Sequence, residues 1–271
     1  MRASSPRPAP SAGRPSGGYA AFRRASAPTK PGGEPPFSDL GLWITKLLIK
    51  RTLTNANCDW NAWLTGPNTY FGTYEAFAEA AGVATKTAWQ TVHALDALGF
   101  VAGAAAAAPL VKVDELLTRI RGATRDPTRR LECRWLLPGH DSLRRLLSGR
   151  LSIEEGFHAG TRTVWREGPR LCLAGFSAAR AHALSVTNVQ LAEVHVDPDV
   201  SPEALGLVRT ELGERSEVVL HRTKRPEAVF RAAVVRDGLP CADIVQTWLD
   251  VVDHRQRGIE QAARLREAMI G

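Results

Sequence analysis

The sequence predicts an α+β protein in which a mainly helical N-terminal part precedes a mixed part of strands and helices. Apolar residues recur at helical spacing from about residue 40 to residue 98, whereas short β-rich segments alternate with helical ones after residue 129. The 271 residues, 44% of them hydrophobic, are enough to bury sizeable cores. We therefore expect one large folded domain or two smaller ones.

Residues 1–36 differ from the rest of the chain. They contain eight prolines and five glycines but few groups able to form a core, which predicts a disordered leader. The leader carries six basic residues against one acidic residue. Its arginines could touch phosphate weakly, although a solubilising role explains them equally well.

Globular composition begins at Phe37, where an apolar stripe predicts a first helix. The stripe consists of Leu40, Ile44, Leu47 and Leu48, with Trp43 beside it. The segment WNAWLTGPN, residues 60–68, then supplies two tryptophans and a Gly-Pro-Asn turn.

Residues 73–100, TYEAFAEAAGVATKTAWQTVHALDALGF, read as a helix, a tight turn and a second helix. Gly82 allows the turn, Thr85 is expected to cap the second helix, and Gly99 ends it. The apolar stripe of the first helix is Tyr74, Phe77, Ala78 and Ala81, and the expected buried face of the second is Ala88, Val92, Leu95 and Leu98.

The segments FVAG and PLVKV flank an alanine run, residues 104–108, and predict the two strands of a small hairpin. Helix, turn, helix and hairpin in this order form a winged helix-turn-helix, which we assign to residues 37–118. A domain of this kind used only for protein contacts is the alternative. The net negative charge of these residues and the lack of arginine in the expected wing favour that alternative.

The outward face of the second helix is the candidate surface for DNA. Its polar side chains can hydrogen-bond base edges or phosphates. Trp89 could instead pack against the first helix, and packing is favoured for it. The predicted DNA-contacting residues of this helix are Thr85, Lys86, Thr87, Trp89, Gln90 and His93.

The net charge of +7 is concentrated in the leader and in one short block. Residues 119–150 carry nine arginines against three acidic residues, whereas residues 37–118 and 151–271 are each slightly acidic. A localised polyanion contact would need such a block, although a solvated surface explains it equally well. The predicted phosphate contacts of the block are Arg119, Arg121, Arg125, Arg129 and Arg130.

Residues 119–271 are expected to form an α+β domain, beginning with a strand at LECRWLLP and a short helix at SLRRLLSG. A strand and a helix starting near Ser177 follow, and Ser177 is expected to cap that helix. Residues 191–198 and 216–223 are β-rich, with an alternation that would leave one face solvated. The rest is an Asp-Gly turn at residues 237–238, a helix capped by Asp243 and a last helix, RGIEQAARLREAMI.

Signals for catalysis are weak, and we predict no enzyme and no cofactor. GFSAA matches the hydrolase serine turn at only three positions. Glu193, Asp197 and Asp199 lack the further ligand and lysine of nuclease sites, while His182 and His195 stand alone in the sequence. No glycine-rich phosphate loop is present.

Neither a metal site nor a membrane span is expected. Cys58, Cys133, Cys172 and Cys241 are far apart and have no zinc-type spacing, so they are read as buried thiols. The longest apolar run near the start, residues 40–49, is too short to cross a bilayer. No secretory signal is convincing, and the expected location is the cytoplasm.

One further pattern is a resemblance to a known family. VFRAAVVRDGLPCADIVQTWLDVVDHRQRGIEQAARL, preceded by LAGFSAARAHAL and a helix-turn-helix, resembles the AbiEi-type antitoxins of bacterial type IV toxin-antitoxin systems over about residues 70–268. The resemblance implies a winged domain that binds inverted repeats in its own promoter and represses it, and a C-terminal domain with antitoxin activity. It also implies a nucleotidyltransferase-like toxin as functional partner, antagonised without need of a stable complex.

These observations predict a DNA-binding transcriptional repressor that acts as the antitoxin of a type IV system. A stand-alone winged-helix regulator is the main alternative, with a ligand-sensing or protein-interaction C-terminal domain. The long leader, the added first helix and the lack of arginine in the wing depart from the family pattern.

Overall fold

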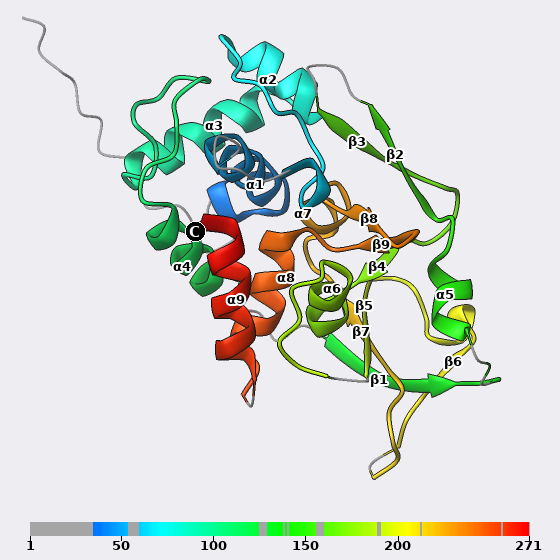
Figure 1. Ribbon diagram of the computed structural model, residues 1–271. Helices are drawn as coiled ribbons and strands as arrows, with labels where there is room; N and C mark the ends of the chain where they lie inside the picture. Colours follow the sequence, from blue (N-terminus) through cyan, green and yellow to red (C-terminus); the bar gives the residue numbers. More distant parts are fainter. Residues whose placement is uncertain are drawn as a thin grey trace, which may run out of the picture. The chain divides into compact units, whose positions relative to one another are not determined.

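The computed structural model describes residues 35–53, 60–124, 129–137, 139, 141–155, 160–188, 191–211, 213–255 and 257–270. Helices and a mixed sheet make up this part of the chain, which confirms the expected α+β class (Figure 1). The leader predicted at residues 1–36 lies outside the described residues, apart from the two prolines that open the first short helix.

The N-terminal part is helical. Its elements are η1 (Pro35–Phe37), α1 (Asp39–Leu53), η2 (Trp60–Ala62), α2 (Tyr74–Ala81), α3 (Thr85–Ala97) and α4 (Val113–Thr124). Strands and helices then alternate as β1 (Arg129–Trp135), α5 (Ser142–Leu147), β2 (Leu151–Glu155), β3 (Thr161–Trp165), β4 (Leu171–Leu173), α6 (Gly175–Ala181) and β5 (Ala192–Val196). The chain continues with η3 (Glu203–Leu205), β6 (Leu207–Arg209), β7 (Val218–Arg222), α7 (Pro226–Phe230), β8 (Val234–Arg236), β9 (Leu239–Cys241), α8 (Ile244–Val252) and α9 (Gly258–Ile270).

The described strands form one mixed sheet in the order β6-β1-β7-β5-β4-β9-β8 and a separate β2-β3 pair. β5 runs parallel to β7, and β4 runs parallel to β9, whereas the other neighbours are antiparallel. The expectation of one solvated face on β5 and β7 is wrong. Nearly every residue of both strands is buried, because the two lie side by side inside the sheet.

Several local predictions for the second part are confirmed. Asp237 and Gly238 both have positive φ angles, 51° and 75°, and they turn the chain between the antiparallel strands β8 and β9. The Asp243 carboxylate caps α8 by accepting hydrogen bonds from the main-chain nitrogens of Val245 and Gln246.

α2 and α3 form the expected pair of helices. Thr73 caps α2 through its side chain, and Gly82 ends it in the left-handed region with a φ of 64°. Thr85 is not the cap of α3 as predicted, since the extended residue before the helix is Ala84 and no side chain caps it. Leu98 was also misplaced: it follows the last helical residue and is exposed, while Thr91 is buried instead.

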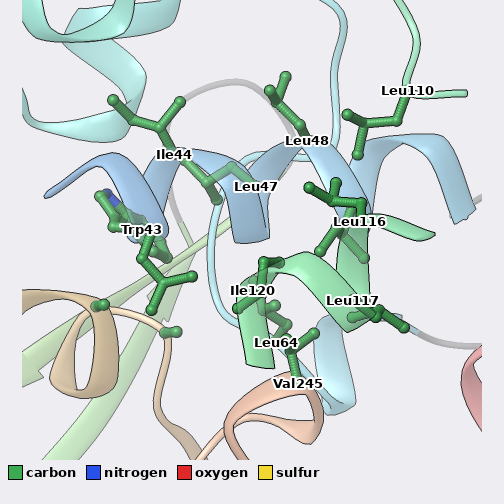
Figure 2. Close-up of a cluster of buried hydrophobic side chains, with 14 of the residues drawn as sticks. Trp43, Ile44, Leu47, Leu48, Leu64, Leu110, Leu116, Leu117, Ile120 and Val245 are labelled. Atoms are coloured by element: carbon green, nitrogen blue, oxygen red, sulfur yellow. The ribbon is translucent and has the colours of Figure 1, made fainter. Parts of the chain in front are cut away.

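α1 lies at the centre of the larger hydrophobic core, with every residue from Gly41 to Arg51 buried. Figure 2 shows its apolar side chains together with those of α4 and with Val245 of α8. The same cluster reaches Leu265 of α9, so one core extends over both sides of the boundary predicted at residue 118. Residues 33–271 form one compact unit.

Candidate functional site

The inner face of α3 is packed in the core, and its outer face is left exposed. Ala88, Val92 and Leu95 are buried in the core, and the Thr91 hydroxyl is satisfied by donating to the Thr87 carbonyl oxygen at 2.8 Å. This packing fixes the rotation of the helix about its axis. Of the predicted contact residues on α3, the exposed ones are Thr85, Lys86, Trp89 and Gln90, and the half-buried ones are Thr87 and His93.

Trp89 is an exposed residue and is not among those packed against the core around the first helix, α1, contrary to the favoured expectation. It is 47% exposed, and its ring lies 4.1 Å from the ring of His93. His93 in turn lies 6.1 Å from Tyr74, whose hydroxyl donates to the carbonyl oxygen of Ala104. An aromatic row therefore connects the outer face of α3 with the loop that follows the helix.

That loop is the segment predicted as a two-stranded hairpin, and it keeps only one antiparallel bridge, Val101 with Leu110. Its alanines are held by Arg51 of α1, whose guanidinium donates to the carbonyl oxygens of Ala106 and Ala108 at 2.8 and 2.6 Å. Burial lowers the pKa of Arg51 from its ordinary value. The contact between Arg51 and the alanine run was not predicted, because nothing in an alanine run indicates a distant partner.

The described arginines among the predicted phosphate contacts lie in different surroundings. Arg119 is exposed on α4, the Nε of Arg121 donates to Asp253 at 3.0 Å, and Arg130 of β1 donates to Glu193 at 3.2 Å. Arg125 lies outside the described residues, and Arg129 is described only as the first residue of β1. Arg121 and Arg130 instead meet in the lining of a cavity to which α3 contributes no residue.

This cavity encloses about 470 Å³ between α4, the middle of the sheet and α8. It has apolar walls and two carboxylates, Asp250 and Asp253. Its cationic and imidazole side chains are Arg121, Arg130, Lys224, Arg225, His195, His221 and His254. We refer to it as the basic cavity.

His195 and His221 meet because β5 and β7 pair in register, which places the two residues opposite each other with ring centres 5.5 Å apart. His195 Nε2 lies 2.7 Å from Asp250 Oδ2 of α8, and His221 Nε2 lies 3.5 Å from Glu193 Oε1. The interpretation of His195 as a lone histidine is therefore wrong. The signal available in the sequence was a histidine among the apolar residues of each of two β-rich segments.

Asp250 and Glu193 are themselves fixed by the turn that opens α6. The main-chain N–H of Gly175 donates to Asp250, and that of Phe176 donates to Glu193 Oε2 at 2.8 Å. Gly175 has a φ of 50°, and a Cβ at this position would lie 2.1 Å from Glu193 Oε2, so only glycine fits. Ser177 does not cap α6 as predicted, because its hydroxyl contacts the main chain of Leu191 and Glu193.

The electrostatics around His195 and His221 keep the carboxylates of Asp250 and Glu193 ionised. Burial would raise the pKa of Asp250, but the charge and hydrogen bond of His195, helped by His221, outweigh it and lower this pKa to about 2. Burial likewise opposes ionisation of Glu193, yet His221 and the Phe176 N–H hold its pKa below the ordinary value. The ionised carboxylates of Asp250 and Glu193 thus lie next to the imidazoles of His195 and His221.

The remaining candidates have structural partners. Asp197 accepts hydrogen bonds from Arg170, and His182 Nε2 lies 2.8 Å from the Ala242 carbonyl oxygen. Cys133, Cys172 and Cys241 are buried free thiols as expected, while Cys58 lies outside the described residues. Within the described part of the chain, no three His, Cys, Asp or Glu side chains are grouped so that they could hold a metal ion.

Comparisons with protein families, with curated proteins and with solved structures find no match to this chain. Among the described helices, none has the length and apolar character needed to cross a membrane.

Proposed function

We propose that this protein is a DNA-binding transcriptional repressor that reads double-stranded DNA with the outer face of α3. The observation that carries this proposal is the contrast between the two faces of that helix. Its inner face is fixed in the core, while Lys86 and Gln90 are exposed and bond to no other described side chain. In this proposal α1 to α4 and the Arg51-anchored loop act as a winged helix-turn-helix.

The chemistry of the exposed residues fits the two kinds of contact that DNA recognition needs. The Gln90 amide offers a donor and an acceptor that match adenine in the major groove, and Thr87 can bond to base edges. Lys86 and Thr85, in the first turn of α3, suit phosphate oxygens, since a helix N-terminus attracts anions. Trp89 and His93 would then add an aromatic surface beside the groove, and Arg119 on α4 a further phosphate contact.

The antitoxin role belongs to the same proposal and is supported by the resemblance in the C-terminal part. We infer a cytoplasmic autoregulator that binds inverted repeats in its own promoter. Its functional partner would be a nucleotidyltransferase-like toxin, antagonised without need of a stable complex. Co-expression of the adjacent gene with and without this protein tests the role: rescue of growth is expected, and growth arrest in both cases would contradict it.

Fluorescence anisotropy across a salt series tests the repressor proposal. The purified protein is titrated with its own upstream DNA and with a scrambled duplex of equal length. A preference of about a thousandfold or more for the upstream DNA is expected. Equal binding to both duplexes would show that the protein binds DNA only through its charge, and it would overturn sequence-specific repression.

Lys86→Ala separates phosphate contact from base readout in the same assay. Because Lys86 is assigned to phosphate, its loss should weaken both duplexes alike and reduce the salt slope by about one unit. An unchanged salt dependence of the affinity would show that Lys86 does not contact phosphate.

A further inference from the structure

We propose that the basic cavity is a binding site for a small phosphate monoester of the size of a nucleoside monophosphate. This inference does not rest on DNA binding, because it concerns a cavity that contains no residue of α3. Its volume of about 470 Å³ lies within the range of roughly 300–1,000 Å³ that is typical of small-molecule sites.

The first support is the excess of positive charge in the lining. The lining has four cationic side chains, Arg121, Arg130, Lys224 and Arg225, and two carboxylates. Arg130 also pairs with Glu193, which lies outside the lining. Arg225 donates to the carbonyl oxygens of Phe37 and Ala123 at 3.2 and 3.3 Å, so no described carboxylate neutralises its charge. Each guanidinium also has five N–H donors, and the carboxylate contacts use only some of them. These remaining donors suit a ligand with several acceptor oxygens.

The second support is a buried polar atom without a partner. The His195 side chain is 3% exposed, its Nε2 is engaged by Asp250, and its Nδ1 has no hydrogen-bond partner among the described residues. Leaving such an atom unsatisfied is unfavourable in a folded protein, which makes it a marker of a ligand site. Because Asp250 occupies Nε2, Nδ1 is the ring nitrogen that remains for a contact with a ligand.

The third support is the combination of groups, which favours a phosphate monoester over a simple carboxylate. A phosphate monoester carries about two negative charges and three acceptor oxygens, which match the three imidazoles and four cations of the lining. An inorganic anion alone would leave the apolar wall formed by Leu42, Val229 and Leu249 without a contact. The organic part of a nucleoside monophosphate would cover that wall.

Isothermal titration calorimetry of the full-length protein without DNA tests the proposal. The probes are AMP, GMP, CMP and UMP, each compared with its parent nucleoside and with sodium sulfate at equal ionic strength. At least one monophosphate should bind at one site per chain and raise Tm by roughly 5 °C at saturation, whereas the nucleosides and sulfate should not. Absence of binding by all four monophosphates, or equal effects of sulfate, would overturn the proposal.

Two variants locate the site. Lys224→Ala and Arg130→Ala should each weaken the monophosphate by about tenfold or more, because each removes a charged donor. Arg264→Ala is the matched control, since Arg264 is an exposed arginine on α9 that pairs with Glu267 and does not line the cavity. Unchanged affinity in both cavity variants would overturn the assignment. Because no DNA is present, failure here is distinguishable from failure of the repressor proposal.

Discussion

At the scale of single residues, the most unusual feature is a buried cation in α1. Lys46 and Asp243 are both fully buried, 2.7 Å apart, and Lys46 also donates to the Ala228 carbonyl oxygen and the Gln246 side chain. Burial raises the pKa of Asp243, against the lowering effect of Lys46. The ammonium group therefore satisfies a carboxylate that would otherwise be buried without a counter-charge.

Lys46→Met should lower the free energy of unfolding by about 3–5 kcal/mol, because Asp243 would remain buried without its cation. Urea denaturation at pH 7 measures this change. Lys112→Met is the control, because Lys112 is exposed and only weakly paired with Glu115, and it should change stability by no more than about 0.5 kcal/mol. Adding Asp243→Asn to Lys46→Met should recover part of the loss, since asparagine also caps helices. Equal stability of Lys46→Met and the control would contradict this account.

His182 makes folding stability depend on pH. Burial lowers its pKa to about 4 from the ordinary 6.5, and Arg236 adds to this against the hydrogen bond to the Ala242 carbonyl oxygen. Between about pH 6.5 and pH 4, His182 therefore binds a proton in the unfolded chain but stays neutral in the folded protein. Stability should fall by up to about 3 kcal/mol as the pH drops from 6.5 to 4.

Comparison with His182→Gln isolates that contribution. Urea unfolding of both proteins between pH 7 and pH 4.5 should give a steeper decline for the unmodified chain, because glutamine does not titrate. Parallel curves would show that His182 is not the titrating group.

At the scale of elements, local signals predicted the helices well and the long-range pairings poorly. The caps and apolar stripes of α2 and α8 depend on neighbouring residues, and the structure has both helices in their expected places. The β2-β3 pair was not expected, and the solvated face of β5 and β7 was wrong, because sheet neighbours lie far apart in sequence. The basic cavity was missed for the same reason: β1, β5, β7, α4 and α8 contribute its lining residues from distant positions.

The proposed role of α3 leads to a prediction for Gln90. Gln90→Ala should cost about 1–3 kcal/mol on the cognate duplex and relax specificity at one base pair, because the amide is assigned to a base edge. Anisotropy with duplexes substituted one base pair at a time measures both effects. Thr118→Ala on α4 is a neutral exposed control. If Gln90→Ala distinguished the substituted duplexes as well as the unmodified protein does, Gln90 would not contact a base edge.

At the scale of the whole molecule, α1 joins the parts that the sequence separated at residue 118. Asp39 accepts hydrogen bonds from the main-chain nitrogens of Glu227 and Ala228 at the start of α7, and Lys46 bonds to Asp243 at the start of α8. The Nε1 of Trp43 donates to Ala81 at the end of α2. One helix thus fixes the ends of three others, two of them in the second part of the chain.

This arrangement predicts one cooperative unfolding transition for residues 33–271. Removing either part would expose the apolar residues around α1 and leave Asp243 without Lys46, so neither part should retain its structure while the other unfolds. Tryptophans lie on both sides of residue 118, among them Trp43, Trp60, Trp165 and Trp248, so fluorescence reports on both parts. Urea curves from tryptophan fluorescence and far-ultraviolet circular dichroism should therefore coincide, and Lys46→Met should shift both by the same amount. Two separated transitions, only one of which responded to Lys46→Met, would instead establish two independently folding domains with a boundary near residue 118.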